Sequence, residues 1–135
     1  MQHLRVSQLR KSYGDHEVIA GIDFELQAGE CFGLLGPNGA GKTTTLRLCL
    51  GLTDPNGGEI RMFGLPVPQK AREARQRIGV VPQDDNLDPD FTVLENLLVY
   101  ARYYNIPTNV ARERARELLE FVQLSEKARV NVEKL

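Results

Sequence analysis

A short glycine-rich stretch has residue types and spacing that suit the binding of phosphate groups. Gly36-Pro37-Asn38-Gly39-Ala40-Gly41-Lys42-Thr43 fits the spacing G-x-x-x-x-G-K-[ST]. Glycines let a backbone turn tightly and aim successive N–H groups at one anion. Lys42 adds a positive charge for the β- and γ-phosphates, and the Thr43 hydroxyl is the expected Mg²⁺ ligand. We predict that this loop, together with Thr44, binds ATP and Mg²⁺ and that Lys42 is catalytic.

The residues around this loop favour the phosphate-binding interpretation over a plain surface turn. Cys31–Leu35 is almost wholly apolar and predicts a strand buried on both faces, as in a parallel sheet. Lys42–Leu50 then predicts a helix, with Gly51 as its C-terminal stop. The free N–H groups and positive dipole of such a helix would face the same anion. The apolar face of the helix is expected to contain Leu46, Cys49 and Leu50.

The remaining pattern divides the chain into a strand-rich part and a helix-rich part. Strands are predicted at Leu4–Leu9, Val18–Leu26, Glu59–Phe63 and Ile78–Val81, from alternating or continuous apolar residues. A short charged helix is predicted within Gln69–Arg77. We therefore predict one domain over residues 1–135, with an α/β nucleotide-binding core portion at 1–82 and the start of a helical subdomain at 83–135.

The helical part opens with a recognisable start signal. Thr92-Val93-Leu94-Glu95 has the pattern of a capping box, in which the Thr side chain caps the helix and the Glu reaches back. Pro107 is expected to end this helix, and Asn109–Val122 predicts a second one. The arginines and glutamates of the second helix alternate in sign, as in a solvated, salt-bridged face. This pattern argues against a nucleic-acid interface.

Composition points the same way and excludes several classes of protein. The chain has 135 residues, 41% of them hydrophobic and 26% charged, with a net charge of −1. Nucleic-acid and membrane-surface binders need a basic surplus, which this chain lacks. No segment approaches the ~18 apolar residues of a membrane span. Cys31 and Cys49 lie in apolar sequence, which predicts two reduced core thiols.

Taken together, these motifs resemble the opening of the ATP-binding subunits of ABC transporters. The resemblance covers essentially the whole chain. The motifs that carry it are Leu9–Gly14, Gly21–Phe24, Gly29-Glu30, Gly33–Leu52 and Gly57–Ile60. Two features argue against other phosphate-binding families: nucleotide kinases usually have a single strand before the loop, and the Asn-Lys-x-Asp guanine reader of GTPases is absent. The stretch Val80–Leu97, VVPQDDNLDPDFTVLENL, is similar to the drug-export and nodulation-factor-export branch.

The resemblance implies a fold class and further site residues. It implies an α/β fold: a P-loop NTPase core with an N-terminal antiparallel β subdomain and a following helical subdomain. Tyr13 would stack on the adenine ring, although a surface tyrosine at a strand end is the plain alternative. Val18 would line the same wall, or equally be a core residue. Gln83 would be a catalytic residue that contacts Mg²⁺ and the attacking water, although a loop glutamine after a proline is common.

Partners and location also follow from the resemblance. The loop Asp84–Asp90 and the helix from Val93 would face a membrane permease, and a second ATP-binding subunit would complete a dimer. The protein would be cytoplasmic and peripheral on the inner face of the cell membrane. Hydrolysed ATP would drive export through the permease.

The resemblance also implies that the chain is truncated before the signature motif. Leu135 matches the first residue of the family's Leu-Ser-Gly-Gly signature, and the catalytic glutamate and a later histidine would follow it. We therefore expect weak nucleotide binding, no meaningful turnover and an exposed strand edge for these 135 residues alone. Two alternatives stay open: a soluble ABC-type regulator without a permease, and a non-catalytic fragment that pairs with an intact subunit.

Overall fold

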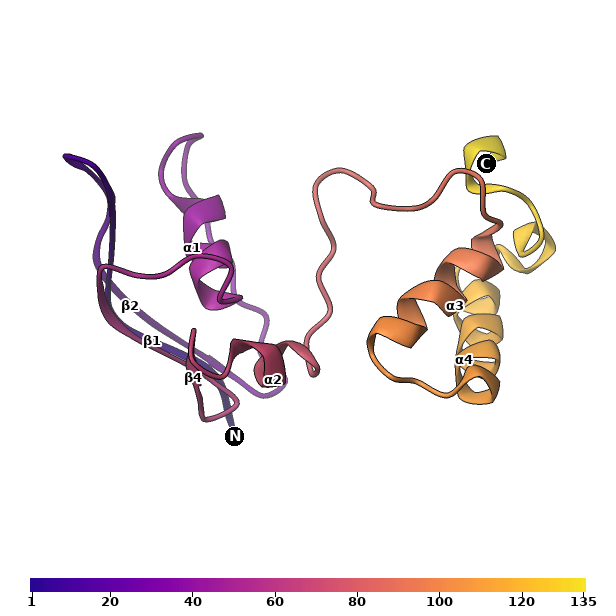
Figure 1. Ribbon diagram of the computed structural model, residues 1–135, viewed down its shortest axis with the longest axis horizontal. Helices are drawn as coiled ribbons and strands as arrows, with labels where there is room; N and C mark the ends of the chain where they lie inside the picture. Colours follow the sequence, from indigo (N-terminus) through magenta and orange to yellow (C-terminus); the bar gives the residue numbers. More distant parts are fainter. The chain divides into compact units, whose positions relative to one another are not determined.

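The chain forms two compact units, which we describe separately. A computed structural model describes residues 1–135. The first unit comprises Met1–Gly79 and the second Val80–Leu135. The sheet with α1 and α2 belongs to the first unit, and α3 and α4 belong to the second (Figure 1).

The first unit is built on a four-stranded antiparallel sheet with the strand order β2-β1-β3-β4. Strands β1 and β2 are twelve residues long and form a hairpin that ends with Tyr13 opposite His16. This hairpin is the antiparallel β subdomain that the sequence resemblance implies. The bounds of the strands are Gln2–Tyr13 for β1, His16–Gln27 for β2, Gly57–Met62 for β3 and Leu65–Val67 for β4.

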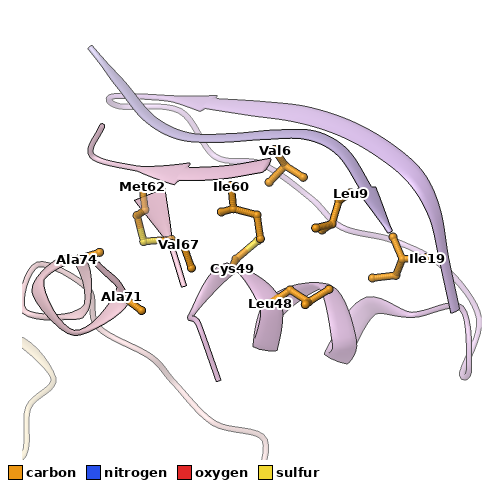
Figure 2. Close-up of a cluster of buried hydrophobic side chains, with 10 residues drawn as sticks. All are labelled: Val6, Leu9, Ile19, Leu48, Cys49, Ile60, Met62, Val67, Ala71 and Ala74. Atoms are coloured by element: carbon orange, nitrogen blue, oxygen red, sulfur yellow. The ribbon is translucent and has the colours of Figure 1, made fainter. Parts of the chain in front are cut away.

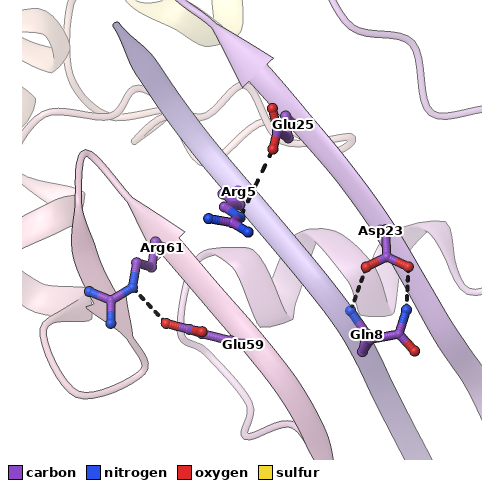
Figure 3. A network of polar contacts seen from close by, with 6 residues as sticks. All are labelled: Arg5, Gln8, Asp23, Glu25, Glu59 and Arg61. Atoms are coloured by element: carbon purple, nitrogen blue, oxygen red, sulfur yellow. Dashed lines mark hydrogen bonds and ion pairs between the residues drawn. The ribbon is translucent and has the colours of Figure 1, made fainter.

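A bulge in β1 interrupts the strict alternation predicted for its first half. The register with β2 shifts between Val6 and Leu9, and Gln8 adopts a positive φ of 48°. As a result Val6 and Leu9, three positions apart, are both fully buried. The carboxylate of Asp23 accepts hydrogen bonds from the Gln8 backbone N–H at 2.9 Å and from its side-chain amide at 2.5 Å (Figure 3). This double contact satisfies the backbone donor that the bulge removes from the strand ladder.

The core of the first unit lies between the sheet and the two helices α1 (Lys42–Cys49) and α2 (Ala71–Arg75). Figure 2 shows side chains of the sheet and of α1 meeting in this core. Gly51, with a φ of 68°, follows α1 and fits the predicted stop. The buried members of the cluster are Val6, Leu9, Ile19, Leu48, Cys49, Ile60, Met62, Val67, Ala71 and Ala74.

The predicted apolar face of α1 is wrong by part of a turn. Thr45, Leu48 and Cys49 are the buried residues of the helix, whereas Leu46 is 58% exposed. Thr45, Leu48 and Cys49 are spaced i, i+3, i+4 and share the face toward the sheet. Leu46 follows Thr45 by one position, which rotates it by about 100° away from the centre of that face. The sequence has apolar residues on both sides of the helix, and only the position of the sheet selects between them.

Two segments predicted to be buried strands do not form strands in the structure. Cys31–Leu35 and Ile78–Val81 have no strand assignment, and Leu35 and Val81 are 93% and 97% exposed. A buried parallel strand exists only when neighbouring strands satisfy its backbone and cover its faces, and the four-stranded sheet contains neither segment. For the same reason Cys31 is exposed rather than a core thiol, whereas Cys49 is buried as expected.

The second unit consists of two helices and two short 3₁₀ turns. Helix α3 spans Val93–Tyr103 and α4 spans Thr108–Phe121, followed by 3₁₀ turns at Ser125–Lys127 and Val132–Lys134. Helix α3 ends four residues before Pro107, the predicted stop. The buried residues of α4 are spaced four apart, which gives the helix one apolar face. These residues are Ala111, Ala115 and Leu119.

The predicted start of α3 is confirmed. The Thr92 hydroxyl accepts a hydrogen bond from the Glu95 N–H at 3.2 Å, and a Glu95 carboxylate oxygen accepts one from the Thr92 N–H at 2.8 Å. None of the helices is both long enough and apolar enough to cross a lipid bilayer.

Candidate functional site

The predicted phosphate loop leads directly into the first turn of α1. Helix α1 begins at Lys42, and Gly41 is its N-cap with φ 93° and ψ 11°. The Thr45 backbone N–H and its hydroxyl both donate to the Gly41 carbonyl, at 2.9 and 2.8 Å. Because Gly41 has no side chain, the first turn has no side-chain cap at its N-cap position. The first amides of the helix therefore suit an external acceptor.

The loop also rests against the second strand of the sheet. A β-carbon added at Gly41 would lie 3.1 Å from the carbonyl oxygen of Val18 and 3.3 Å from its Cγ1. A φ of 93° is in addition a conformation that L-residues rarely adopt. Backbone conformation and close approach thus both require glycine at this position, as the motif predicts.

A cavity of about 330 Å³ lies beside the loop. No aspartate, glutamate or arginine lines the cavity, and Lys42 is the lysine that does. The Lys42 ammonium donates a hydrogen bond to the Gly36 carbonyl, so it lies within the turn of the loop. Backbone amides, an ammonium and hydroxyls form a donor set for an anion. The lining residues are His16, Val18, Asn38, Gly39, Gly41, Lys42, Thr43 and Thr44.

The same donor set defines how a metal ion could fit. The chain contains no cluster of three or more His, Cys, Asp or Glu residues able to hold a metal ion. Mg²⁺ is commonly held by one or two protein ligands together with phosphate oxygens and water. The Thr43 hydroxyl at the cavity fits that role. A magnesium ion here would be bound mainly by phosphate oxygens of the ligand and by water.

The structure places the two residues predicted to contact the base differently. Val18 lines the cavity and also packs against the core, so both of its predicted roles are compatible with its position. Tyr13 ends β1, is 52% exposed and does not line the cavity. The Lys11 ammonium lies 5.0 Å from the centre of its ring. Tyr13 is therefore about half exposed, with the Lys11 ammonium over its ring.

His16 is a cavity residue that the sequence analysis missed. It is the first residue of β2 and pairs with Tyr13 across the hairpin. The signal was present in the sequence: His16 follows the turn Gly14-Asp15, so it had to lie opposite Tyr13 if the two strands formed a hairpin. Its presence in the cavity wall depends on β2 packing against Gly41.

Gln83 belongs to the second unit, whereas the phosphate loop belongs to the first. Gln83 is exposed and lines a mostly apolar cavity of about 690 Å³ within the second unit, together with Leu97 and Tyr100 of α3. Each unit therefore places its own predicted site residues: the loop, Tyr13 and Val18 in one, and Gln83 in the other.

The acidic loop after Gln83 is fastened to α3 through a buried side chain. Asn96 is 4% exposed. Its side-chain oxygen accepts from the Asp88 N–H at 2.8 Å, and its amide donates to the carbonyls of Asp88 at 3.0 Å and Thr92 at 3.1 Å. The Tyr100 hydroxyl also donates to the Asn86 carbonyl at 2.8 Å. The loop Asp84–Asp90 is thus exposed to solvent but tied to the helix at defined points.

With this geometry established, comparison with known proteins gives the family. Residues 19–135 match the family described as ABC transporter. The chain belongs to the ABC transporter family. The match confirms the resemblance drawn from the motifs, and it covers both units of the chain.

Individual relatives indicate which branch of the ABC transporter family this chain resembles. The chain is 59% identical over 128 residues to "Nod factor export ATP-binding protein I" of Burkholderia pseudomallei (strain K96243), covering 95% of this chain and 42% of that protein. It is 54% identical over 132 residues to the protein of that name from Cupriavidus metallidurans, covering 98% of this chain and 44% of the relative. The chain therefore spans less than half the length of these relatives. Their names agree with the predicted export branch.

A solved structure from the same ABC transporter family confirms the fold class. "Structure of ATP binding subunit of ABC transporter" matches 96% of this chain and 54% of its own chain, with a TM-score of 0.84 and 27% sequence identity. The predicted P-loop NTPase fold, with its antiparallel β subdomain and helices, is thus confirmed.

Proposed function

We propose that this chain is the ATP-binding portion of a subunit that energises an ABC exporter through a separate membrane permease. The observation that carries the proposal is the cavity at the start of α1, where Lys42, Thr43 and Thr44 line one anion site without any carboxylate. In this proposal the triphosphate of ATP occupies the loop, with Mg²⁺ bound to its outer oxygens.

The residues of the loop divide the work of holding the triphosphate. Gly36, Gly39 and Gly41 allow the backbone N–H groups to surround the phosphates. The Lys42 ammonium exchanges its contact with the Gly36 carbonyl for the β- and γ-phosphates. Bound Mg²⁺ supplies charge neutralisation, with the Thr43 hydroxyl as its protein ligand.

Residues outside the loop complete the proposed nucleotide site. Tyr13, exposed at the end of β1, offers a ring face for adenine, and Val18 contributes an apolar wall. Gln83 is proposed to contact Mg²⁺ and the attacking water. Phosphoryl transfer depends on several positioned charges acting together. Since no carboxylate lines the cavity to serve as a base, we propose that the chain alone binds ATP without turning it over.

The proposed domain organisation assigns partners to the second unit. Residues 1–82 would be the nucleotide-binding core portion and 83–135 the start of a helical subdomain. The loop Asp84–Asp90 and α3 would face the permease, and a second ATP-binding subunit would complete a dimer at the inner face of the membrane. The defined anchoring of this loop through Asn96 supports such a role, because a docking loop needs a fixed shape.

The names of the relatives support the direction and cargo of transport. The proteins called "Nod factor export ATP-binding protein I" are 52–59% identical to this chain. We therefore propose export rather than import. The proposed cargo belongs to the same chemical class as the Nod factor in the names of these relatives. The permease would select the cargo, and this chain would contribute the energy of ATP binding.

Displacement of a fluorescent ATP analogue tests the nucleotide part of the proposal. Mg·ATP and Mg·tripolyphosphate are both expected to displace the analogue from the wild-type chain, whereas adenosine should do so poorly. Phosphate release should stay at the background rate. Displacement by adenosine but not by tripolyphosphate would contradict a phosphate-centred site. A steady phosphate release that is abolished in Lys42→Ala would contradict the proposed inactivity of the chain alone.

A further inference from the structure

His16 occupies a position in the phosphate cavity that the proposed function leaves without a role. It is exposed, it begins β2, and it lines the same 330 Å³ cavity as Lys42 and Thr43. The imidazole of His16 is also the one aromatic ring among the residues that line the cavity, because Tyr13 does not line it. A wall residue with this chemistry is available to a bound ligand.

The packing of β2 fixes where the imidazole can reach. The loop at Gly41 approaches within contact distance of Val18, two residues along the strand from His16. This contact holds the beginning of β2 against the phosphate loop. At the other side His16 pairs with Tyr13 across the hairpin. His16 therefore lies between the residue proposed to hold the base and the residues proposed to hold the phosphates.

The charges around His16 leave its ring free for a ligand. Its sequence neighbours are Asp15 and Glu17, and neither lines the cavity. The Glu17 carboxylate forms an ion pair with Arg10 at 3.7 Å. No carboxylate in the cavity competes for the imidazole, which offers both a donor and an acceptor in its neutral form. The group of a nucleotide that offers hydroxyls to such a ring, and that lies between the base and the phosphates, is its sugar.

We propose that His16 is a nucleotide-binding residue that contacts the sugar of a nucleotide whose phosphates lie in the Gly36–Thr43 loop. This inference rests on the proposed function, because it needs the outer phosphates to be held there. It assigns the middle part of the ligand to a residue of the hairpin rather than of the loop. His16 would thus contact the nucleoside part of the ligand, which inorganic polyphosphate lacks.

Nuclear magnetic resonance of the histidine rings tests the contact without altering the site. The chain has two histidines, His3 and His16, and His3 packs edge-on against Phe63 with ring centres 5.1 Å apart. The His3→Ala variant assigns the two sets of imidazole signals. Saturating Mg·ADP is expected to shift the His16 signals and leave those of His3 in place, whereas Mg·tripolyphosphate should leave both nearly unchanged.

Substitution provides a second and quantitative readout. His16→Ala is expected to weaken Mg·ADP binding about 3- to 10-fold, the usual effect of losing one hydrogen bond, and to leave the affinity for tripolyphosphate unchanged. His3→Ala is the matched control and should leave both affinities unchanged.

The possible outcomes separate this inference from the function on which it rests. If His16 signals do not move with bound Mg·ADP, or if tripolyphosphate moves them as much, the inference is overturned and nucleotide binding at the loop stands. Equal losses of ADP and tripolyphosphate affinity in His16→Ala would overturn it in the same way. If the wild-type chain binds neither ligand, the proposed function and the inference both fail.

Discussion

At the scale of single residues, Gly41 connects the phosphate loop to the sheet. Its positive φ ends the loop and begins α1, and the space where a side chain would project is filled by Val18. The glycine of the motif is therefore required twice, once by backbone conformation and once by contact. The sequence motif gave the first reason, but the contact with β2 depends on tertiary packing that no local pattern contains.

Replacing Gly41 by alanine should destabilise the first unit as well as the site. A non-glycine residue in a rare backbone region costs ~1–3 kcal/mol, and the close approach to the Val18 carbonyl adds to that cost. Thermal unfolding followed by circular dichroism should show a lower midpoint. Gly79→Ala is the matched control, because nothing lies within 4 Å of its added β-carbon and its φ is not positive. Equal midpoints for the two variants would contradict the packing described here.

The two cysteines should differ in reactivity, which tests the corrected position of Cys31. Cys31 is exposed and Cys49 is buried, and burial raises the pKa of the Cys49 thiol to about 11. Since the thiolate is the reactive form, iodoacetamide at pH 8 should label Cys31 quickly and Cys49 only after unfolding, as read by mass spectrometry. Cys31→Ser should remove the fast reaction. Fast labelling of Cys49 in the folded chain would contradict its place in the core.

The raised pKa of Cys49 also gives the sign of a pH effect on stability. The folded chain disfavours the thiolate, so its stability contribution is complete below the ordinary thiol pKa of about 8.5. The contribution is lost as the pH rises from there through the folded pKa of about 11.

At the scale of elements, the start of helix α3 could be predicted from the sequence, whereas its contact with the acidic loop could not. The capping box at Thr92 and Glu95 is a local pattern, and it was predicted correctly with both of its hydrogen bonds. Asn96, one position further on, reads in sequence as an ordinary polar helix residue. In the structure it is buried and ties the acidic loop to the helix. This partnership spans eight residues and depends on how the loop folds back.

Asn96→Ala should loosen the acidic loop while leaving the helix in place. The Asp88 N–H would lose its acceptor at 2.8 Å, and leaving a buried polar group unsatisfied costs ~1–3 kcal/mol. Hydrogen exchange at the Asp88 amide should become clearly faster. Asn109→Ala, an exposed asparagine in the first turn of α4, is the matched control and should leave that exchange unchanged. If Asp88 exchanges equally fast in the wild type, Asn96 does not hold the loop.

The same contrast explains which strands could be predicted from the sequence. Parts of β1 and β2 were predicted as strands because they alternate in polarity, whereas their antiparallel arrangement was implied by the family resemblance. Cys31–Leu35 and Ile78–Val81 were predicted as buried strands from composition alone, and neither forms a strand here. A strand of this kind is defined by its neighbours in a sheet, and the apolar run does not identify them.

At the scale of the whole molecule, the residues predicted to bind the nucleotide are distributed over both units. The loop, Val18 and His16 form a single cavity wall in the first unit, whereas Gln83 and the acidic loop lie in the second. The motif predicted the exact residues of the phosphate loop, because the residues that bind phosphate follow one another in the sequence. His16 was missed because it joins the cavity only through packing between the hairpin and the loop. The chain covers 42–44% of the length of its relatives, and the roles of Tyr13 and Gln83 stay predictions.

The most direct test of the account is calorimetric titration of the folded chain with Mg·ATP. We predict heat of binding that saturates at one nucleotide per chain and is lost or greatly weakened in Lys42→Ala, because the ammonium at the loop is the positive charge lining the cavity. Lys134→Ala, a solvent-exposed lysine in the second unit, should bind as the wild type does. Absence of binding by the wild-type chain, or binding that Lys42→Ala leaves unchanged, would contradict the central claim that this loop holds the phosphates.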